Sequence, residues 1–121
     1  VGPYAQVVLV GIGTSTQREE DWRRAREPLD LMLDAVRAAA VDSGAPTLLA
    51  EVDYLAVPHG RWRYRNPGGA LAREIGAMHA QSVFASVGVL QQSLIGEACA
   101  RIAAGEARAT LVVGGDCGYR L

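Results

Sequence analysis

The side chains best able to do covalent or metal chemistry are two cysteines and two histidines. Cys99 and Cys117 form no CxxC pair and no disulfide framework. Cys99 lies among alanines in a helical pattern, and Cys117 follows a Gly-Gly pair, where we expect it to be the more exposed of the two. Neither begins a helix, where a thiol becomes reactive, so both are predicted to be structural. His59 and His79 have no companions at ligand spacing, so we predict no metal site.

The densest cluster of charge and aromatic rings is the segment His59–Pro67, which reads HGRWRYRNP. Arg61, Trp62 and Arg63 could bind a phosphate or stack on an adenine, because guanidinium groups pair with phosphates and indole faces attract flat or cationic groups. The alternative is that the arginine stems and rings pack this loop against a neighbouring subunit. The interface interpretation is favoured, since arginine and aromatic residues are enriched at interfaces. The segment is too short to indicate nucleic-acid binding.

Two further motifs are similar to known catalytic or cofactor sequences but depart from them. Ser86 lies in the sequence FASVG, which is similar to a G-x-S-x-G elbow, but Phe84 replaces the first glycine that permits the tight turn. A strand serine near an interface is the better interpretation of Ser86. The sequence GIGT at residues 11–14 begins like a dinucleotide fingerprint, but Thr16 replaces the third glycine and a charged loop follows.

The elements that must position these residues alternate between strand and helix. Strands are predicted at Val7–Val10, Tyr54–Val57, Ser82–Val87 and Ala109–Val113, and helices at residues 28–43, Pro67–Ile75 and about 90–104. Leu48–Val52 is predicted to form another helical turn. Residues 14–26 are polar and read as a solvated loop anchored by Trp22. This alternation predicts an α/β fold, a mostly parallel sheet with helices packed against it.

The helix predicted at about 90–104 is apolar nearly all round. Its polar stripe is narrow and consists of Gln91, Gln92, Glu97 and Arg101. Such a helix should be buried, and one sheet face cannot cover it in so small a domain. We therefore expect a second layer from a partner chain or a C-terminal region, with residues 1–121 forming one incomplete N-terminal domain of a longer polypeptide.

Composition and charge exclude several classes of protein. Half of the 121 residues are hydrophobic and the net charge is −1, so no basic field favours nucleic acid. The longest apolar segment, around Val89–Ala104, contains Glu97 and Arg101, so we predict no membrane span. The apolar run Val7–Val10 is too short for a targeting peptide. Two cysteines that form no disulfide framework indicate a reducing compartment, so the predicted location is the cytoplasm.

The order of strand, glycine, helix, IAAGEA, strand and VVGGD resembles the N-terminal half of the thiolase superfamily. The segments VLVGIGTST, EPLDLMLDAVRAAAVDSG and LLAEVDYLAVP are similar too. The likeness is greatest to thiolase-like acetyl-CoA acetyltransferases related to sterol-carrier-protein thiolases. The resemblance implies a layered thiolase-like half-fold with a buried helix. It also implies acyl transfer from coenzyme A thioesters without a further cofactor and a role in lipid metabolism. The expected assembly is a homodimer or a larger oligomer formed through Ser82–Val87.

The resemblance places Gly88 at the position of the acyl-accepting cysteine, by an ungapped count from Ile102 and Gly105. Glycine offers nothing to acylate, so classical thiolase chemistry by this chain alone is not expected. The free N–H groups at Gly88 and Val89 could still hold a carbonyl or an anion. Three hypotheses are compatible with the sequence. The chain belongs to an acyltransferase that relies on residues outside it, it is a non-catalytic acyl-CoA-binding or scaffold subunit, or it is a serine hydrolase built on Ser86.

Overall fold

The computed structural model describes residues 6–85 and 91–117. In chain order its elements are the helix α1 (Pro28–Ser43), the 3₁₀ helix η1 (Pro46–Glu51), the strand β1 (Tyr54–Pro58), the helix α2 (Pro67–Ile75), the strand β2 (Gln81–Ala85), the helix α3 (Gln91–Ala103) and the strand β3 (Thr110–Val112). The three helices, the helical turn before β1 and the last three predicted strands are thus confirmed in the described residues, with shifted ends.

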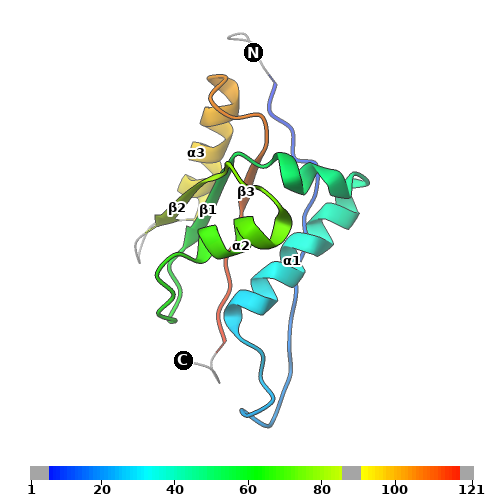
Figure 1. Ribbon diagram of the computed structural model, residues 1–121, viewed down its shortest axis with the longest axis vertical. Helices are drawn as coiled ribbons and strands as arrows, with labels where there is room; N and C mark the ends of the chain where they lie inside the picture. The colour runs from blue at the N-terminus through cyan, green and yellow to red at the C-terminus, as the bar shows by residue number, and fades with distance from the viewer. Residues whose placement is uncertain (1–5, 86–90, 118–121) are drawn as a thin grey trace.

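The three strands form a parallel sheet in the order β2-β1-β3 (Figure 1). Tyr54 of β1 lies opposite Gln81 of β2 and Thr110 of β3. Alternate side chains of the central strand point to opposite faces. Leu55 and Val57 pack with α1 and α2, whereas Tyr54 and Ala56 pack with α3. The result is a three-layered α/β arrangement, which confirms the predicted fold class.

The helix α1 forms as its pattern predicts. Pro28 begins it, where the missing N–H is harmless, and Gly44 ends it with a φ of 74° that favours glycine. Its buried side chains, which include Met32 and Val36, face the sheet with Leu71 of α2. This packing places α1 beside α2 on one face of the sheet.

The strand predicted at Val7–Val10 is wrong for the described chain. These residues are not part of a strand in the described chain, and the side chain of Leu9 is 81% exposed; it is the following residues, 11–13, that contact α1. The glycines at 11 and 13 explain the close approach, because a Cβ on either would collide with the backbone of Ala35 or Ala39. The GIG sequence therefore packs the chain on a helix.

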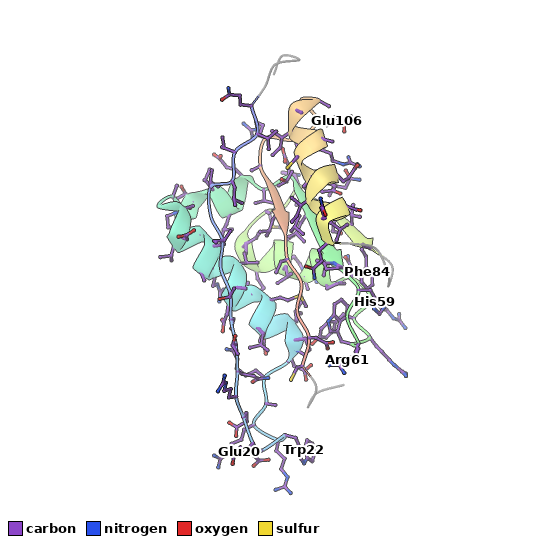
Figure 2. The ribbon with its side chains drawn as sticks, turned by 180° about the vertical axis from the view of Figure 1, so that it is seen from behind. Glu20, Trp22, His59, Arg61, Phe84 and Glu106 are labelled. Atoms are coloured by element: carbon purple, nitrogen blue, oxygen red, sulfur yellow. The ribbon has the colours of Figure 1, made fainter. Side chains whose placement is uncertain are left out.

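The charged segment before α1 is a protruding loop whose anchor differs from the predicted one. Trp22 is 58% exposed near the tip, where Glu20 also lies (Figure 2), so it anchors nothing within the described chain. The side chain of Gln17 closes the base instead. It accepts a hydrogen bond from Arg26 N at 2.9 Å and donates one to Arg26 O at 3.2 Å.

The helix α3 is buried on one face only. Leu94 and Ala98 pack on the sheet, whereas Ile95 on another face is 54% exposed. The prediction of a helix covered all round is therefore not met within the described residues, since a single sheet face reaches only one side. A second layer over the exposed face stays a prediction. None of the described helices combines the length and the apolar character needed to cross a membrane.

Candidate functional site

The carboxyl ends of the three strands meet at one edge of the sheet. Pro58, at the end of β1, lies opposite Ala85, at the end of β2, and His59 N donates a hydrogen bond to Ala85 O at 2.9 Å. The segment Gly114–Cys117 leaves β3 at the same edge. Ligands of open parallel sheets bind outside this edge, so it is the candidate site.

Side chains in the loop after β1 alternate between the protein and solvent. Arg61, Arg63 and Arg65 are exposed, whereas Trp62 is 3% exposed and Tyr64 is half-buried. The indole Nε1 of Trp62 donates to Gly115 O at 2.7 Å. Trp62 and Arg61, predicted together as ligand-binding residues, therefore point to opposite sides, and the guanidinium groups are the members that face solvent.

Tyr64 fastens the same loop to the beginning of α1. Its hydroxyl donates to Glu27 Oε2 at 2.9 Å and accepts from Leu29 N at 3.3 Å. Burial raises the pKa of Tyr64, the hydrogen bond from the Leu29 N–H opposes this rise, and the Glu27 carboxylate adds to it. The phenol is therefore a neutral link between loop and helix.

An aromatic stack fills the space between the ends of β1 and β2. His59 lies 4.8 Å from Phe84 and 5.4 Å from Trp62, measured between ring centroids, with the planes within 9° of parallel. Trp62 also stacks on Phe84 at 5.6 Å, and Tyr64 is tilted against Trp62 at 5.0 Å. Figure 2 shows His59, Phe84 and Arg61 gathered at this edge. Such contacts stiffen the loop that carries the arginines.

An ion pair joins the loop to the segment after β3. Arg61 Nε donates to Asp116 Oδ2 at 2.7 Å, with the two side chains 66% and 33% exposed. The hydrogen bond from Arg61 lowers the pKa of Asp116 below its usual value; burial opposes this, and the Cys117 N–H, 2.9 Å from Oδ1, reinforces it. Asp116 in turn raises the pKa of Arg61. One of the three guanidinium groups is thus already neutralised.

The two glycines after β3 allow this close assembly. A Cβ at Gly114 would lie 2.8 Å from Pro58 Cγ, and one at Gly115 would lie 3.0 Å from Met32 Cγ. Both distances are shorter than ordinary van der Waals contact. The Gly-Gly pair therefore lets the chain after β3 pass between the end of β1 and helix α1.

The two cysteines differ from prediction in exposure. Cys117 is buried and Cys99 only partly so, which reverses the expected order. Cys117 Sγ accepts a hydrogen bond from Gln17 Nε2 at 3.1 Å, because the loop before α1 folds over it. No cluster of metal-ligating side chains occurs among residues 6–85 and 91–117.

The structure brings together only part of the predicted site. Ser86, Gly88 and Val89 lie outside the described residues, so their roles stay predictions. Arg61 and Arg63 lie at the carboxyl edge of the sheet. The partners that sequence analysis missed are Asp116 and Phe84. The acidic residue in VVGGD was a visible signal, but its ion pair with a residue 55 positions away was not.

Comparisons with known proteins agree with this architecture. The chain is 30% identical to a monomeric SCP2-thiolase-like protein type 1 from Mycobacterium smegmatis, with a TM-score of 0.67, and the match covers 90% of this chain and 23% of that protein. The priming β-ketosynthase of the R1128 polyketide biosynthetic pathway is 20% identical with a TM-score of 0.69, over 88% of this chain and 40% of that one.

The chain therefore spans about a quarter of the first of these proteins and two fifths of the second. No protein-family model matches the sequence, and comparison with curated proteins finds no match. The likeness thus rests on the fold, on the 30% identity and on the ordered motifs. Together they show that the chain has a thiolase-like fold and is similar to part of a thiolase-superfamily protein.

Proposed function

We propose that the chain forms part of an acyl-CoA site in a thiolase-like protein and holds the ligand without supplying the residue that becomes acylated. The observation that carries this proposal is the convergence of a stiffened, arginine-bearing loop and the Gly-Gly segment at the carboxyl edge of the sheet. A ligand at this edge would lie beside the strand-to-helix junction at residues 86–90, where thiolase-like proteins carry their nucleophile.

The exposed arginines suit the phosphate groups of coenzyme A. Arg63 and Arg65 are exposed and make no hydrogen bond or ion pair within the described part of the chain. Guanidinium groups form paired hydrogen bonds to phosphates. In this proposal Arg63 and Arg65 contact the ligand, Arg61 supports the loop through Asp116, and Trp62 positions the arginines from beneath instead of stacking on an adenine.

The sequence favours a chain that carries no acylated residue. Gly88 occupies the position expected for the nucleophilic cysteine. The buried thiol of Cys117 is engaged by Gln17, and Cys99 lies within α3 rather than at its beginning. Acyl transfer would then need a nucleophile from elsewhere in the protein. The alternative is a non-catalytic acyl-CoA-binding or scaffold subunit, and Gly88 favours that alternative equally.

Titration calorimetry with CoA and acetyl-CoA tests the binding proposal. The double variant Arg63→Ala, Arg65→Ala should weaken binding by about 10- to 100-fold, since each lost hydrogen bond to a charged group costs roughly 1.5–3 kcal/mol and part of that is regained from solvent. Arg108→Ala is the matched control, because Arg108 is also exposed but precedes β3, at the opposite end of the strands. Equal binding by both variants, or no binding by the parent chain, would contradict the proposal.

Intact-mass analysis after incubation with acetyl-CoA tests the catalytic half of the proposal. We expect no stable adduct on the chain. An acyl group mapped to Ser86, Cys99 or Cys117 would overturn the assignment of a non-nucleophilic role and would name the reactive side chain. A fluorophosphonate adduct abolished by Ser86→Ala would instead support the serine hydrolase.

Assembly through the β2 edge is part of the proposal. The strand β2 is the outer strand of the sheet, so one side of its backbone has no strand neighbour in the described chain. Such an edge can pair with another chain. We propose that a second copy pairs there, through the segment Ser82–Val87. Gln81 N and Ala85 O bond to the residues that flank β1, so the N–H of Ser82 faces the outer side of β2. Replacing Ser82 with proline should therefore abolish this pairing, as measured by light scattering, because proline removes that outward N–H. The matched control Ser82→Ala, which keeps the backbone N–H, should leave the pairing intact.

A further inference from the structure

The loop before α1 ends in a well-defined turn that presents an indole ring to solvent. Arg24 N donates to Asp21 O at 2.9 Å, and Arg23 N donates to Asp21 Oδ1 at 3.0 Å. Trp22 is 58% exposed, and the guanidinium carbon of Arg23 lies 5.8 Å from its ring centroid. A tryptophan beside an arginine is a common anchor of protein interfaces. Because the turn is already formed, little ordering cost remains for binding.

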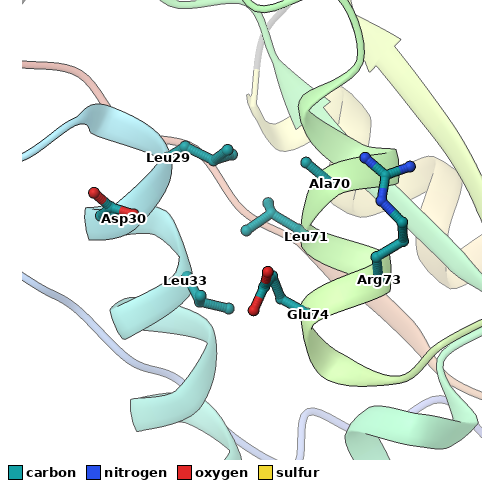
Figure 3. Close-up of a pocket in the computed structure, with 7 residues that line it drawn as sticks. All are labelled: Leu29, Asp30, Leu33, Ala70, Leu71, Arg73 and Glu74. Atoms are coloured by element: carbon teal, nitrogen blue, oxygen red, sulfur yellow. The ribbon is translucent and has the colours of Figure 1, made fainter.

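A groove of complementary character lies between α1 and α2. Its volume is about 240 Å³, and it is lined by Leu29, Asp30, Leu33, Ala70, Leu71, Arg73 and Glu74. Figure 3 shows the leucines of α1 facing Leu71 and Glu74 of α2, while the guanidinium of Arg73 extends along α2 instead of across the groove. The Glu74 carboxylate makes no hydrogen bond or ion pair within residues 6–85 and 91–117. The groove thus offers apolar walls and an unpaired negative charge.

The turn and the groove are complementary in apolar character and in charge. The indole of Trp22 suits the leucine walls, and the positive charge of Arg23 suits Glu74. Within one chain they do not meet, since Trp22 is largely exposed. Both features lie close to the beginning of α1, because the groove is lined by its first turns and the loop runs directly into Pro28 (Figure 1).

We propose that two copies of this chain associate reciprocally, with the Trp22–Arg23 pair of each inserted into the α1–α2 groove of the other. In a two-fold arrangement the same patch occurs on both copies, so the turn of one meets the groove of its partner and the reverse. One aromatic anchor and one ion pair per side predict a weak, reversible association that salt weakens further. This interface is separate from the β2 edge and does not depend on CoA binding.

Sedimentation velocity over a concentration series tests the proposal, with tryptophan emission as a second readout. Trp62 is buried, so a blue shift on association reports the burial of Trp22. Trp22→Ala should abolish this association step, whereas Met78→Ala, at another exposed apolar side chain, should leave it intact. Arg23→Glu and Glu74→Arg should each weaken it by about tenfold or more, because each places like charges together. The double variant should restore it.

The charge exchange also keeps the test valid if Trp22→Ala disturbs the loop, since both charged positions are exposed. Pairing through the β2 edge is a different step, which Trp22→Ala would leave unchanged and Ser82→Pro would remove. If no association step depends on Trp22, or if the double charge variant fails to recover the loss caused by either single one, the proposal is overturned.

Discussion

Replacing Trp62 with alanine should lower the free energy of unfolding by about 3–5 kcal/mol, the range for deleting a large buried aromatic side chain. The ring is 3% exposed and belongs to the core that joins α1, α2 and the sheet. A buried tryptophan removes roughly 150–250 Å² from water, which at about 25 cal/mol per Å² agrees with that range. A domain of this size has a total stability of about 5–15 kcal/mol, so the loss would be severe.

Trp62→Phe separates the hydrogen bond from the packing. The phenyl ring keeps most of the stacking but leaves Gly115 O without the donor that lies 2.7 Å away. The expected cost is about 1–3 kcal/mol, the penalty of an unsatisfied buried acceptor. Urea unfolding followed by far-UV circular dichroism at low micromolar protein measures both variants. Trp22→Ala is the matched control and should change stability by no more than about 0.5 kcal/mol. Equal losses from the alanine variants at 22 and 62 would refute the assigned role of Trp62.

Two further changes test the carboxyl edge by their effect on stability. Gly114→Ala should destabilise the fold by about 1–3 kcal/mol, because its Cβ would lie 2.8 Å from Pro58 Cγ. Gly96→Ala in α3 should stabilise the fold by about 0.5–1 kcal/mol, because a Cβ there would have no atom within 4 Å. A higher melting temperature for Gly114→Ala than for Gly96→Ala would contradict the packing. The Arg61–Asp116 pair should contribute only about 0.2–1 kcal/mol, since it is largely exposed. Because the pKa of Asp116 is lower in the folded state than in the unfolded chain, this contribution is present above the unfolded value and is lost as pH falls through the folded value. The urea midpoints of the parent and Asp116→Asn should therefore converge in acid, and a difference that persists there would argue against the ion pair.

Local pattern was enough to predict the elements that depend on near neighbours. The apolar spacing, the initial proline and the terminal glycine of α1 specify its beginning, face and end without reference to the rest of the chain. The strand prediction for Val7–Val10 was wrong because an extended, β-branched run becomes a strand only beside another strand. No described strand lies next to it, and only the residues that follow, 11–13, pack against α1.

The candidate site was harder to predict because its contacts join distant positions. The alternation of arginine with aromatic residues in RWRYR has the period of an extended chain, which was a usable signal that one set points inward. The alternation does not predict which residues the inward-pointing aromatic side chains contact. Trp62 forms a hydrogen bond with Gly115, 53 residues away, and Tyr64 forms one with Glu27, 37 residues away. The parallel register of the strands brings the segments of Trp62 and Gly115 to one edge, and the packing of α1 on the sheet brings Glu27 there.

The contacts of Trp62 allow two roles of the loop, stabilising the core and binding CoA, to be separated by experiment. If Trp62 positions the arginines, Trp62→Phe should reduce both stability and CoA affinity, although the ring never touches the ligand. Replacing Arg63 and Arg65 should reduce affinity alone, because neither side chain makes a hydrogen bond or an ion pair within the described residues that folding would lose. An intact CoA affinity in Trp62→Phe would mean that the arginines bind from a mobile loop, and the stack of His59, Trp62 and Phe84 would then serve the core and not the site.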